Sequence, residues 1–287
     1  MRRARPALLI LAFAGLTLAS MASAAARPTV HAHRGGSIHE GRPLLGENTL
    51  PALRRAADMG FVLEFDVKLT ANGVPVVFHD ATLERATGCR GEIAAKTLRQ
   101  LSRCKVDIIG TTGNFRQLPP GDRRRASIPT LRSVLKMMRR KRARANIEIK
   151  NQPGDPDFDS SERFASIVCR VIKNSGVPQR RLIIQSFVPT NLNVAKRVLP
   201  NAKLSYLTLS ALNPFAVITA EGSGYDWVSP EWPVDRAFVN DAHAAGLKVV
   251  PYTLDNPRDM RAARAVGVDA LITNDPTRAR RVLRAAG

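Results

Sequence analysis

Three acidic side chains stand in stretches of sequence that are otherwise apolar. Glu64 and Asp66 lie two residues apart within residues 61–67, and Glu148 lies within residues 146–150. Residues two apart on a β-strand point to the same face, so a strand would hold Glu64 and Asp66 side by side. Carboxylates among apolar neighbours repel one another and lose hydration, and a bound divalent cation offsets both costs. Their oxygen atoms suit Ca²⁺ or Mg²⁺; the alternative is a strand end at which the acids stay in water.

Polar side chains end five of the strands that the sequence predicts. The five groups are His33 with Arg34, Glu64 with Asp66, His79, Glu148 with Lys150, and Gln185 with Ser186. In a barrel of parallel strands the carboxyl ends converge on one face, which carries the active site. One such residue would mean little, but five strands that end in this way predict a catalytic face. The histidines outside these groups are interpreted as structural: His31, His39 and His243.

Strands and helices alternate along the chain, which predicts parallel strands joined by helical crossovers. Strands are predicted at residues 29–33, 61–67, 74–78, 146–150, 181–187, 203–209, 226–229, 247–254 and 269–273. Helices are predicted at residues 47–59, 129–140, 161–174, 190–198, 238–245, 258–266 and 277–285. Eight β/α units close a (β/α)₈ TIM barrel, an α/β fold. The nine predicted strands are one too many, and residues 66–79 are too few for a helical crossover. One strand of this pair is therefore expected to be a hairpin arm outside the barrel.

Residues 1–26 have the pattern of a signal peptide. Three arginines among the first five residues precede a short apolar core at 7–19, and A-x-A cleavage sequences follow. The core is too short for an ordinary transmembrane helix, and no later run approaches membrane length. We therefore expect residues 27–287 to be exported, as an extracellular or cell-envelope protein. An uncleaved N-terminal anchor is the alternative.

Residues 81–129 carry clusters of Gly, Pro and Arg and are expected to form an irregular insertion over the barrel mouth, with one short helix near 94–101. Cys89 and Cys104 lie in this insertion, and export would allow a disulfide between them. Closing a loop of this size contributes roughly 3 kcal/mol if the bond is unstrained. Cys169 falls on the apolar side of a predicted helix, so we expect it to be a buried thiol.

The formal net charge of the chain is +20 at pH 7. Such a charge favours anionic partners: phosphate esters, anionic lipid surfaces or wall polymers. The basic runs at 123–125 and 139–142 lack the interleaved aromatic residues of a nucleic-acid site and are interpreted as solvated faces. No nucleic-acid partner is therefore expected.

Together, the motifs of the chain resemble those of the glycerophosphodiester phosphodiesterases, from about residue 30 to the C-terminus. The motifs are HRGG at 33–36, ENTLPAL at 47–53, LEFDVKLTANGVPVVFHD at 63–80, IEIK at 147–150, QSF at 185–187, YTLDN at 252–256 and GVDALITNDP at 267–276. HRGG alone would be a weak signal, but the combination is highly specific. The resemblance implies a TIM barrel that hydrolyses glycerophosphodiesters to sn-glycerol 3-phosphate and an alcohol.

The resemblance also implies a role for each matching residue. These are the metal ligands Glu64, Asp66 and Glu148 for one Ca²⁺ or Mg²⁺, the acid/base pair His33 and His79, the phosphate-binding cations Arg34 and Lys150, and the supporting residues Glu47, Gln185 and Tyr252. The sequence departs from the family pattern at two places. Gly46 precedes Glu47 where proline is usual, and Tyr252 stands where tryptophan is usual.

Two other functions fit parts of the sequence. The first is a related phospholipase D-like phosphodiesterase that attacks lipids, similar to sphingomyelinase D. An apolar segment at 81–129 would favour this alternative, but the segment is polar and Arg-rich. A barrel that only binds wall polymer or lipid headgroups would be expected to have lost a histidine or a metal carboxylate. No protein nucleophile is evident, since Ser186 lacks an adjacent base. The substrate's own 2-hydroxyl is therefore the predicted nucleophile.

Overall fold

The structure, a computed structural model, describes residues 27–108, 122, 125–209, 213 and 215–285. Its centre is a sheet of eight parallel strands in the order β12-β11-β10-β9-β8-β4-β1-β13. The strands are β1 (Thr29–Ala32), β4 (Val62–Leu69), β8 (Ala145–Ile149), β9 (Leu182–Ser186), β10 (Lys203–Thr208), β11 (Trp227–Pro230), β12 (Lys248–Val249) and β13 (Ala270–Thr273). The two edge strands approach each other, since Ile272 N–H donates to Pro251 O at 3.0 Å. The sheet is thus a nearly closed barrel, and the predicted TIM-barrel fold is confirmed.

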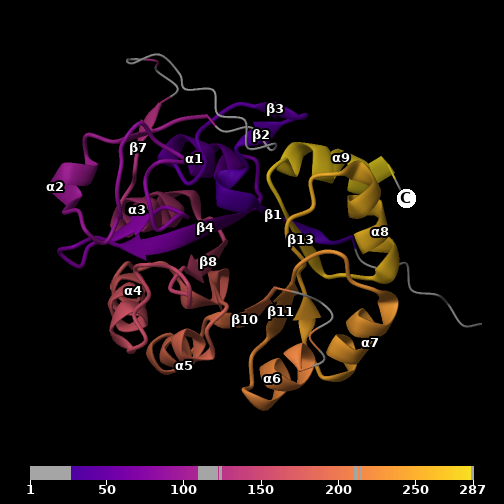
Figure 1. The fold of residues 1–287 in the computed structure, drawn as a ribbon. Helices are drawn as coiled ribbons and strands as arrows, with labels where there is room; N and C mark the ends of the chain where they lie inside the picture. Colours follow the sequence, from indigo (N-terminus) through magenta and orange to yellow (C-terminus); the bar gives the residue numbers. More distant parts are fainter. Residues whose placement is uncertain (1–26, 109–121, 123–124, 210–212, 214, 286–287) are drawn as a thin grey trace, which may run out of the picture.

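Helices surround the strands on the outside of the barrel (Figure 1). They are α1 (Leu50–Asp58), α3 (Leu131–Lys141), α4 (Arg163–Lys173), α5 (Pro189–Val198), α6 (Ala216–Gly222), α7 (Arg236–Ala244), α8 (Pro257–Val266) and α9 (Pro276–Ala285). The sequence predicted all of these except α6, which has seven residues and no side-chain cap. Only Ala216 and Ala220 of α6 are buried, so its sequence has no strong apolar stripe.

Helix α1 begins three residues later than predicted. Thr49 is its N-cap, and the Thr49 side chain accepts a hydrogen bond from Ala52 N–H. Glu47 therefore lies before the helix, in the loop that reaches the carboxyl ends of the strands.

The predicted hairpin arm is confirmed. Strand β5 (Pro75–Val77) pairs antiparallel with β4 and lies outside the order of the eight barrel strands. The insertion after it contains α2 (Leu98–Leu101) and a two-stranded sheet of β6 (Lys105–Val106) and β7 (Ala126–Ser127). The expected disulfide between Cys89 and Cys104 is present.

The insertion shares a small apolar core with the β5 arm. Leu83, Ile93 and Leu101 of the insertion are buried in one cluster with Phe78, which directly follows β5. Residues 109–121 and 123–124 of the insertion lie outside the described residues, as does the predicted signal peptide at 1–26.

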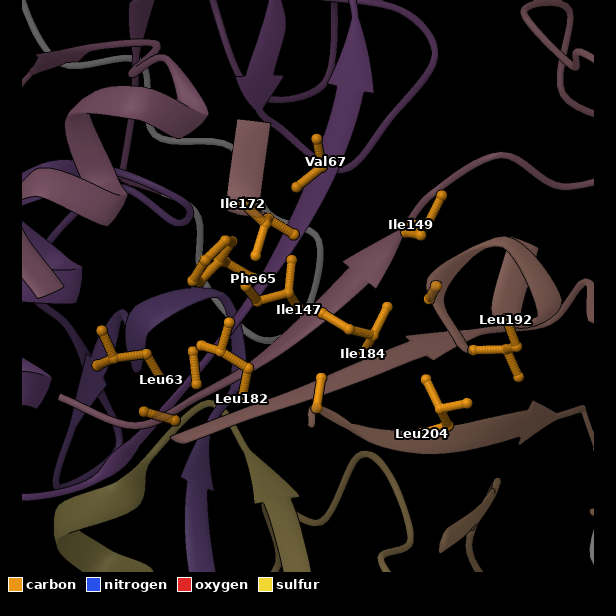
Figure 2. Packing of buried hydrophobic residues seen from close by; sticks show 14 of the residues in the cluster. Leu63, Phe65, Val67, Ile147, Ile149, Ile172, Leu182, Ile184, Leu192 and Leu204 are labelled. Carbon is orange, nitrogen blue, oxygen red and sulfur yellow. The ribbon is translucent and has the colours of Figure 1, made fainter. Parts of the chain in front are cut away.

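Alternation along β4 divides its side chains between two environments. Leu63, Phe65 and Val67 pack with Ile147 and Ile172 in the layer between strands and helices (Figure 2). Burial of each such side chain contributes roughly 1.5–3 kcal/mol. The intervening residues of β4 consequently face the barrel interior, which is how an apolar strand carries two acids to the site.

The three histidines outside the predicted site and the free thiol occupy structural positions. His31 is buried inside the barrel, with 1% of its surface exposed. His243 on α7 pairs with Asp269. His39 belongs to the short strand β2 (Ile38–His39), which pairs with β3 (Arg42–Pro43). Cys169 is buried, which raises the pKa of its thiol to about 12. Within the described residues, no helix has the length and apolarity to cross a membrane.

Candidate active site

A cavity of about 280 Å³ lies at the carboxyl ends of the barrel strands. Nine of the ten predicted site residues line it: His33, Arg34, Glu64, Asp66, His79, Glu148, Lys150, Gln185 and Tyr252. The tenth, Glu47, stands directly behind the cavity, with its Oε1 3.0 Å from Arg34 Nη1. The sequence therefore predicted which side chains meet, although they come from segments up to 219 positions apart, since Tyr252 lies that far from His33.

Three carboxylates form the floor of the cavity. Glu64, Asp66 and Glu148 are buried, and one oxygen of each lies within 4.8 Å of the others. The register of β4 and β8 creates this cluster, because it places Asp66 directly opposite Glu148. Asp66 Oδ1 is buried and has no hydrogen-bond partner among the described residues. Three carboxylate oxygens, with the buried Asp66 Oδ1 still free to accept, form a donor set that suits a divalent cation.

The charges of these carboxylates are unequal. Burial, together with the charges of Asp66 and Glu148, raises the pKa of Glu64 well above its usual value. Burial likewise raises the pKa of Glu148 to about 7, against the attraction of Lys150. Burial also disfavours ionisation of Asp66, but the positive charges of His79 and Arg34 outweigh it and hold its pKa below the usual range. The cluster is thus short of positive charge, which a cation would supply.

Neighbouring groups hold two of the carboxylates in place. Gln185 Nε2 donates to Glu64 Oε1 at 2.9 Å, and the Arg34 backbone N–H donates to Glu64 Oε2 at 2.8 Å. Asn48 Nδ2 donates to Asp66 Oδ2 at 2.8 Å. The sequence reasoning missed Asn48, although it is the central residue of the ENT motif.

The HRGG turn carries two of the site residues and requires unusual backbone conformations. Arg34 has a φ of 50° and Gly36 a φ of 66°, both in the left-handed region. A Cβ on Gly36 would lie 2.6 Å from Pro276 Cγ, so only glycine fits there. The strain at Arg34, a non-glycine residue, directs its backbone N–H at Glu64 and its side chain at Glu47.

Two cations flank the carboxylates. Lys150 Nζ lies 2.9 Å from Glu148 Oε1 and 5.3 Å from the centre of the Phe187 ring. Arg34 Nε lies 3.7 Å from Asp66 Oδ2. Both cations line the cavity, so a bound anion would meet positive charge on two sides.

The tautomer of His33 is set by its hydrogen bonds. His33 Nδ1 lies 2.8 Å from Asn274 Oδ1. Asn274 Nδ2 donates to Asp255 Oδ2 at 2.7 Å, so the oxygen of the amide must face His33. His33 Nδ1 therefore carries a proton and Nε2 keeps its lone pair. Burial, followed by the charge of Arg34, lowers the pKa of His33 to about 3, which keeps this ring neutral.

His79 stands in a different electrostatic environment. Its Nδ1 lies 2.5 Å from Asp80 Oδ1, and Arg85 bridges Asp80 and Glu47 with its guanidinium group. Burial lowers the pKa of His79, while the carboxylates of Asp66 and Asp80 oppose that shift. Asp80 and Arg85 were missed by sequence reasoning, although Asp80 directly follows His79.

Aromatic and acidic groups complete the wall. Tyr252 Oη donates to Thr208 O at 2.8 Å, and its ring meets the Phe187 ring edge-on at 6.1 Å. The aromatic wall is therefore present although Tyr252 replaces the usual tryptophan. Glu231 also lines the cavity and was not predicted.

Comparison with known proteins places the chain in a family. Residues 33–278 match the model of the glycerophosphoryl diester phosphodiesterase family. A glycerophosphodiester phosphodiesterase of Caldanaerobacter subterraneus is 30% identical over 248 residues, which cover 86% of this chain and 94% of that protein.

Solved structures show the same architecture. A crystal structure from Silicibacter pomeroyi superposes with a TM-score of 0.76 at 24% identity, covering 90% of this chain and 93% of that one. An Oleispira antarctica phosphodiesterase in complex with the product sn-glycerol-3-phosphate superposes with a TM-score of 0.74 at 25% identity, covering 90% and 97%.

Barrel and site together define a phosphodiester hydrolase with the TIM-barrel fold. The chain belongs to the glycerophosphoryl diester phosphodiesterase family. The resemblance inferred from the sequence motifs is thereby confirmed.

Proposed function

We propose that the protein hydrolyses glycerophosphodiesters to sn-glycerol 3-phosphate and an alcohol. The observation that carries the proposal is the meeting of two histidines, three carboxylates and two cations in one cavity of about 280 Å³. The Oleispira relative, whose complex holds sn-glycerol-3-phosphate, supports this choice of product.

Glu64, Asp66 and Glu148 would hold one divalent cation, Ca²⁺ or Mg²⁺. The unpartnered Asp66 Oδ1 and the all-oxygen donor set support this assignment. When bound, the cation supplies Lewis acidity and orients oxygen ligands beside the phosphate. Lys150 and Arg34 attract the phosphate oxygens, Lys150 as a point charge and Arg34 as a fork of N–H donors.

The two histidines divide the proton transfers. His33 is neutral and offers its Nε2 lone pair, so it takes the proton of the glycerol 2-hydroxyl as that oxygen attacks phosphorus. His79, whose charged form Asp80 stabilises, gives a proton to the alcohol oxygen as its bond to phosphorus breaks. Water then opens the cyclic phosphate, losing its proton to His79 while His33 returns a proton to the 2-oxygen. Each transfer is worth about 10²–10⁴-fold in rate.

We also propose, from the sequence alone, where in or outside the cell the protein acts. Residues 1–26 would be removed on export, and residues 27–287 would work outside the cell or in its envelope. The substrate there is a small glycerophosphodiester or an anionic wall polymer built from such units. Residues 1–26 hold three arginines and no acid, so residues 27–287 carry a formal net charge of 20 − 3 = +17, which supports an anionic substrate in either form.

Release of sn-glycerol 3-phosphate tests the proposal directly. Purified protein with Ca²⁺ or Mg²⁺ is incubated with a panel of diesters: glycerophosphocholine, glycerophosphoethanolamine, glycerophosphoglycerol, a teichoic polymer and a lysophospholipid. We expect sn-glycerol 3-phosphate from at least one non-lipid diester. His79→Ala should abolish release, whereas His39→Ala, an exposed histidine of β2, should stay within about twofold of the parent.

Two results would contradict the proposal. One is the absence of sn-glycerol 3-phosphate from every substrate in the panel. The other is cleavage of the lysophospholipid alone with a lipid phosphate as product, which would favour the lipid-directed alternative.

A further inference from the structure

A second cavity, of about 560 Å³, lies at the opposite end of the barrel. Residues at the amino ends of the eight strands line it, from Thr29 of β1 to Asp269, which directly precedes β13. In TIM barrels catalysis takes place at the carboxyl ends of the strands, and the amino ends contribute to stability. The proposed hydrolysis therefore gives this cavity no role.

The lining of this N-terminal cavity is strongly cationic. Its basic residues are Arg27, Arg144, Arg180, Arg181, Lys203 and Lys248. Asp269 is the one acid in the described lining, and it is already engaged, with its Oδ2 2.9 Å from His243 Nε2. Lys203 has a partner outside the lining, since its Nζ lies 2.7 Å from Asp226 Oδ1. For the four arginines, the described part of the chain offers no acidic partner within ion-pair distance. Like charges gathered around one cavity repel one another, and a bound anion would remove that cost.

An aromatic wall stands beside these cations. The half-buried Trp227 ring lines the cavity, and Lys248 Nζ lies 5.4 Å from its centre. The ring of His31, buried at the floor, lies 6.3 Å from the Trp227 ring. The volume falls within the range of small-molecule sites, about 300–1,000 Å³, in which apolar walls combine with a few polar groups.

We propose that the N-terminal cavity binds a phosphate monoester, with arginine guanidinium groups on the phosphate and the Trp227 ring against the carbon portion. The planar guanidinium group of an arginine can donate two parallel hydrogen bonds to two oxygens of one phosphate. A phosphate monoester carries about −1.5 to −2 charge at pH 7, so it neutralises more of the four arginines than a carboxylate does. A soluble phosphate ester and a lipid with a phosphate monoester headgroup share this chemistry.

Fluorescence of Trp227 reports occupancy of this cavity alone. The chain has two tryptophans, and the other, Trp232, bonds to the Tyr252 backbone at the opposite, catalytic end. In a Trp232→Phe protein the emission therefore comes from Trp227, so binding at the catalytic cavity leaves the signal unchanged. The titrants are inorganic phosphate, glycerol 3-phosphate, and vesicles of phosphatidylcholine with and without phosphatidic acid.

The test compares two double variants in the Trp232→Phe background. We expect a saturable change in emission that Arg144→Gln/Arg181→Gln weakens at least tenfold. Arg132→Gln/Arg140→Gln removes two exposed arginines of α3 and should stay within twofold. Thermal unfolding checks the fold of each, and Arg180→Gln, at an exposed position, serves as the replacement if the first pair fails to fold.

The outcome also identifies the source of the phosphate. A response to glycerol 3-phosphate supports a soluble ester, and a response only to vesicles with phosphatidic acid supports a lipid headgroup. The proposal is overturned if no titrant changes the emission of Trp227. Equal affinity in both double variants overturns it as well, because the arginines of the cavity would then not be the ligands.

Discussion

His33 Nδ1 lies 2.8 Å from Oδ1 of Asn274, although 241 positions separate the two residues in the chain. Asp255 accepts a hydrogen bond from the Asn274 amide and so fixes which end of that amide faces the histidine. The lone pair of His33 is thereby left on Nε2. This relationship distinguishes the two histidines of the site, because His79 faces a carboxylate at the equivalent nitrogen.

Asn274→Asp should shift the pH dependence of catalysis. The new carboxylate would favour the charged imidazole and raise the pKa of His33 from about 3, by roughly 1–3 units. Since His33 must be neutral to act as a base, the acid limb of kcat/KM against pH should move to higher pH. Asn201→Asp, an exposed loop position, is the matched control. An acid limb that stays in place would contradict the role of His33 as the first base.

The sequence was sufficient to predict the barrel because its strands and helices alternate with distinct periodicities. Residues Val62–Leu69 are buried along their whole length and read as a strand without ambiguity. Helix α6 and the hairpin of β2 and β3 were missed, since elements so short carry too few residues for a period to show.

Some residues of the active site were not predicted from the sequence, for a different reason. Residues that face the cavity come from strand ends, and motif spacing identifies them. Asn274 and Arg85 act through other side chains, and the partners His33 and Glu47 lie 241 and 38 positions away in the chain. The motifs at 252–256 and 267–276 contain Asp255 and Asn274, but they do not show that Asp255 orients the Asn274 amide toward His33. Only the folded barrel reveals those contacts.

Removal of the metal should lower stability more at neutral than at acidic pH. In the metal-free protein the pKa of Glu64 is raised and that of Glu148 is about 7, so the native state holds protons that the unfolded state releases from about pH 4.5. This contribution to stability is lost as pH rises toward 7, while cation affinity grows as the carboxylates ionise. The difference in Tm between protein with Ca²⁺ or Mg²⁺ and protein with chelator should therefore widen from about pH 5 to 7.5.

Calorimetric scans at matched pH values measure this difference. The buried neutral histidines His31 and His33 affect both samples alike, so they cancel in the comparison. Glu64→Gln should reduce the difference, and chelation should abolish turnover of the parent. Full turnover in excess chelator would exclude the metal assignment.

His33→Ala and His79→Ala should each reduce kcat by about 10²–10⁴-fold and change KM little. Proton transfer contributes only in the transition state, so its loss leaves ground-state binding nearly intact. Steady-state kinetics on the preferred diester separates the two parameters. A rise in KM with unchanged kcat would instead assign the histidine to substrate binding.

Loss of the disulfide should destabilise the insertion. Cys89 and Cys104 are 15 residues apart, and closing such a loop contributes roughly 3 kcal/mol. The Cys89→Ser/Cys104→Ser variant should accordingly lose about that much free energy of unfolding in urea titration. Reductant should destabilise the parent and leave the variant unchanged. An equal effect of reductant on both would place its action elsewhere, since the third cysteine, Cys169, is a buried thiol.

A diester whose glycerol lacks the 2-hydroxyl should be hydrolysed far more slowly than the parent compound. Among the described lining residues, Thr253 alone is a serine, threonine or cysteine, and no hydrogen bond joins its side chain to His33 or His79. Because the protein offers no nucleophile there, the substrate's 2-hydroxyl is the group expected to attack phosphorus. A diester without this hydroxyl cannot form the cyclic phosphate. Competition kinetics shows whether the deoxy compound still binds, and trapping of the cyclic phosphate from the parent gives an independent measurement. Equal rates for the two diesters would mean that water attacks phosphorus directly, with His33 as its base.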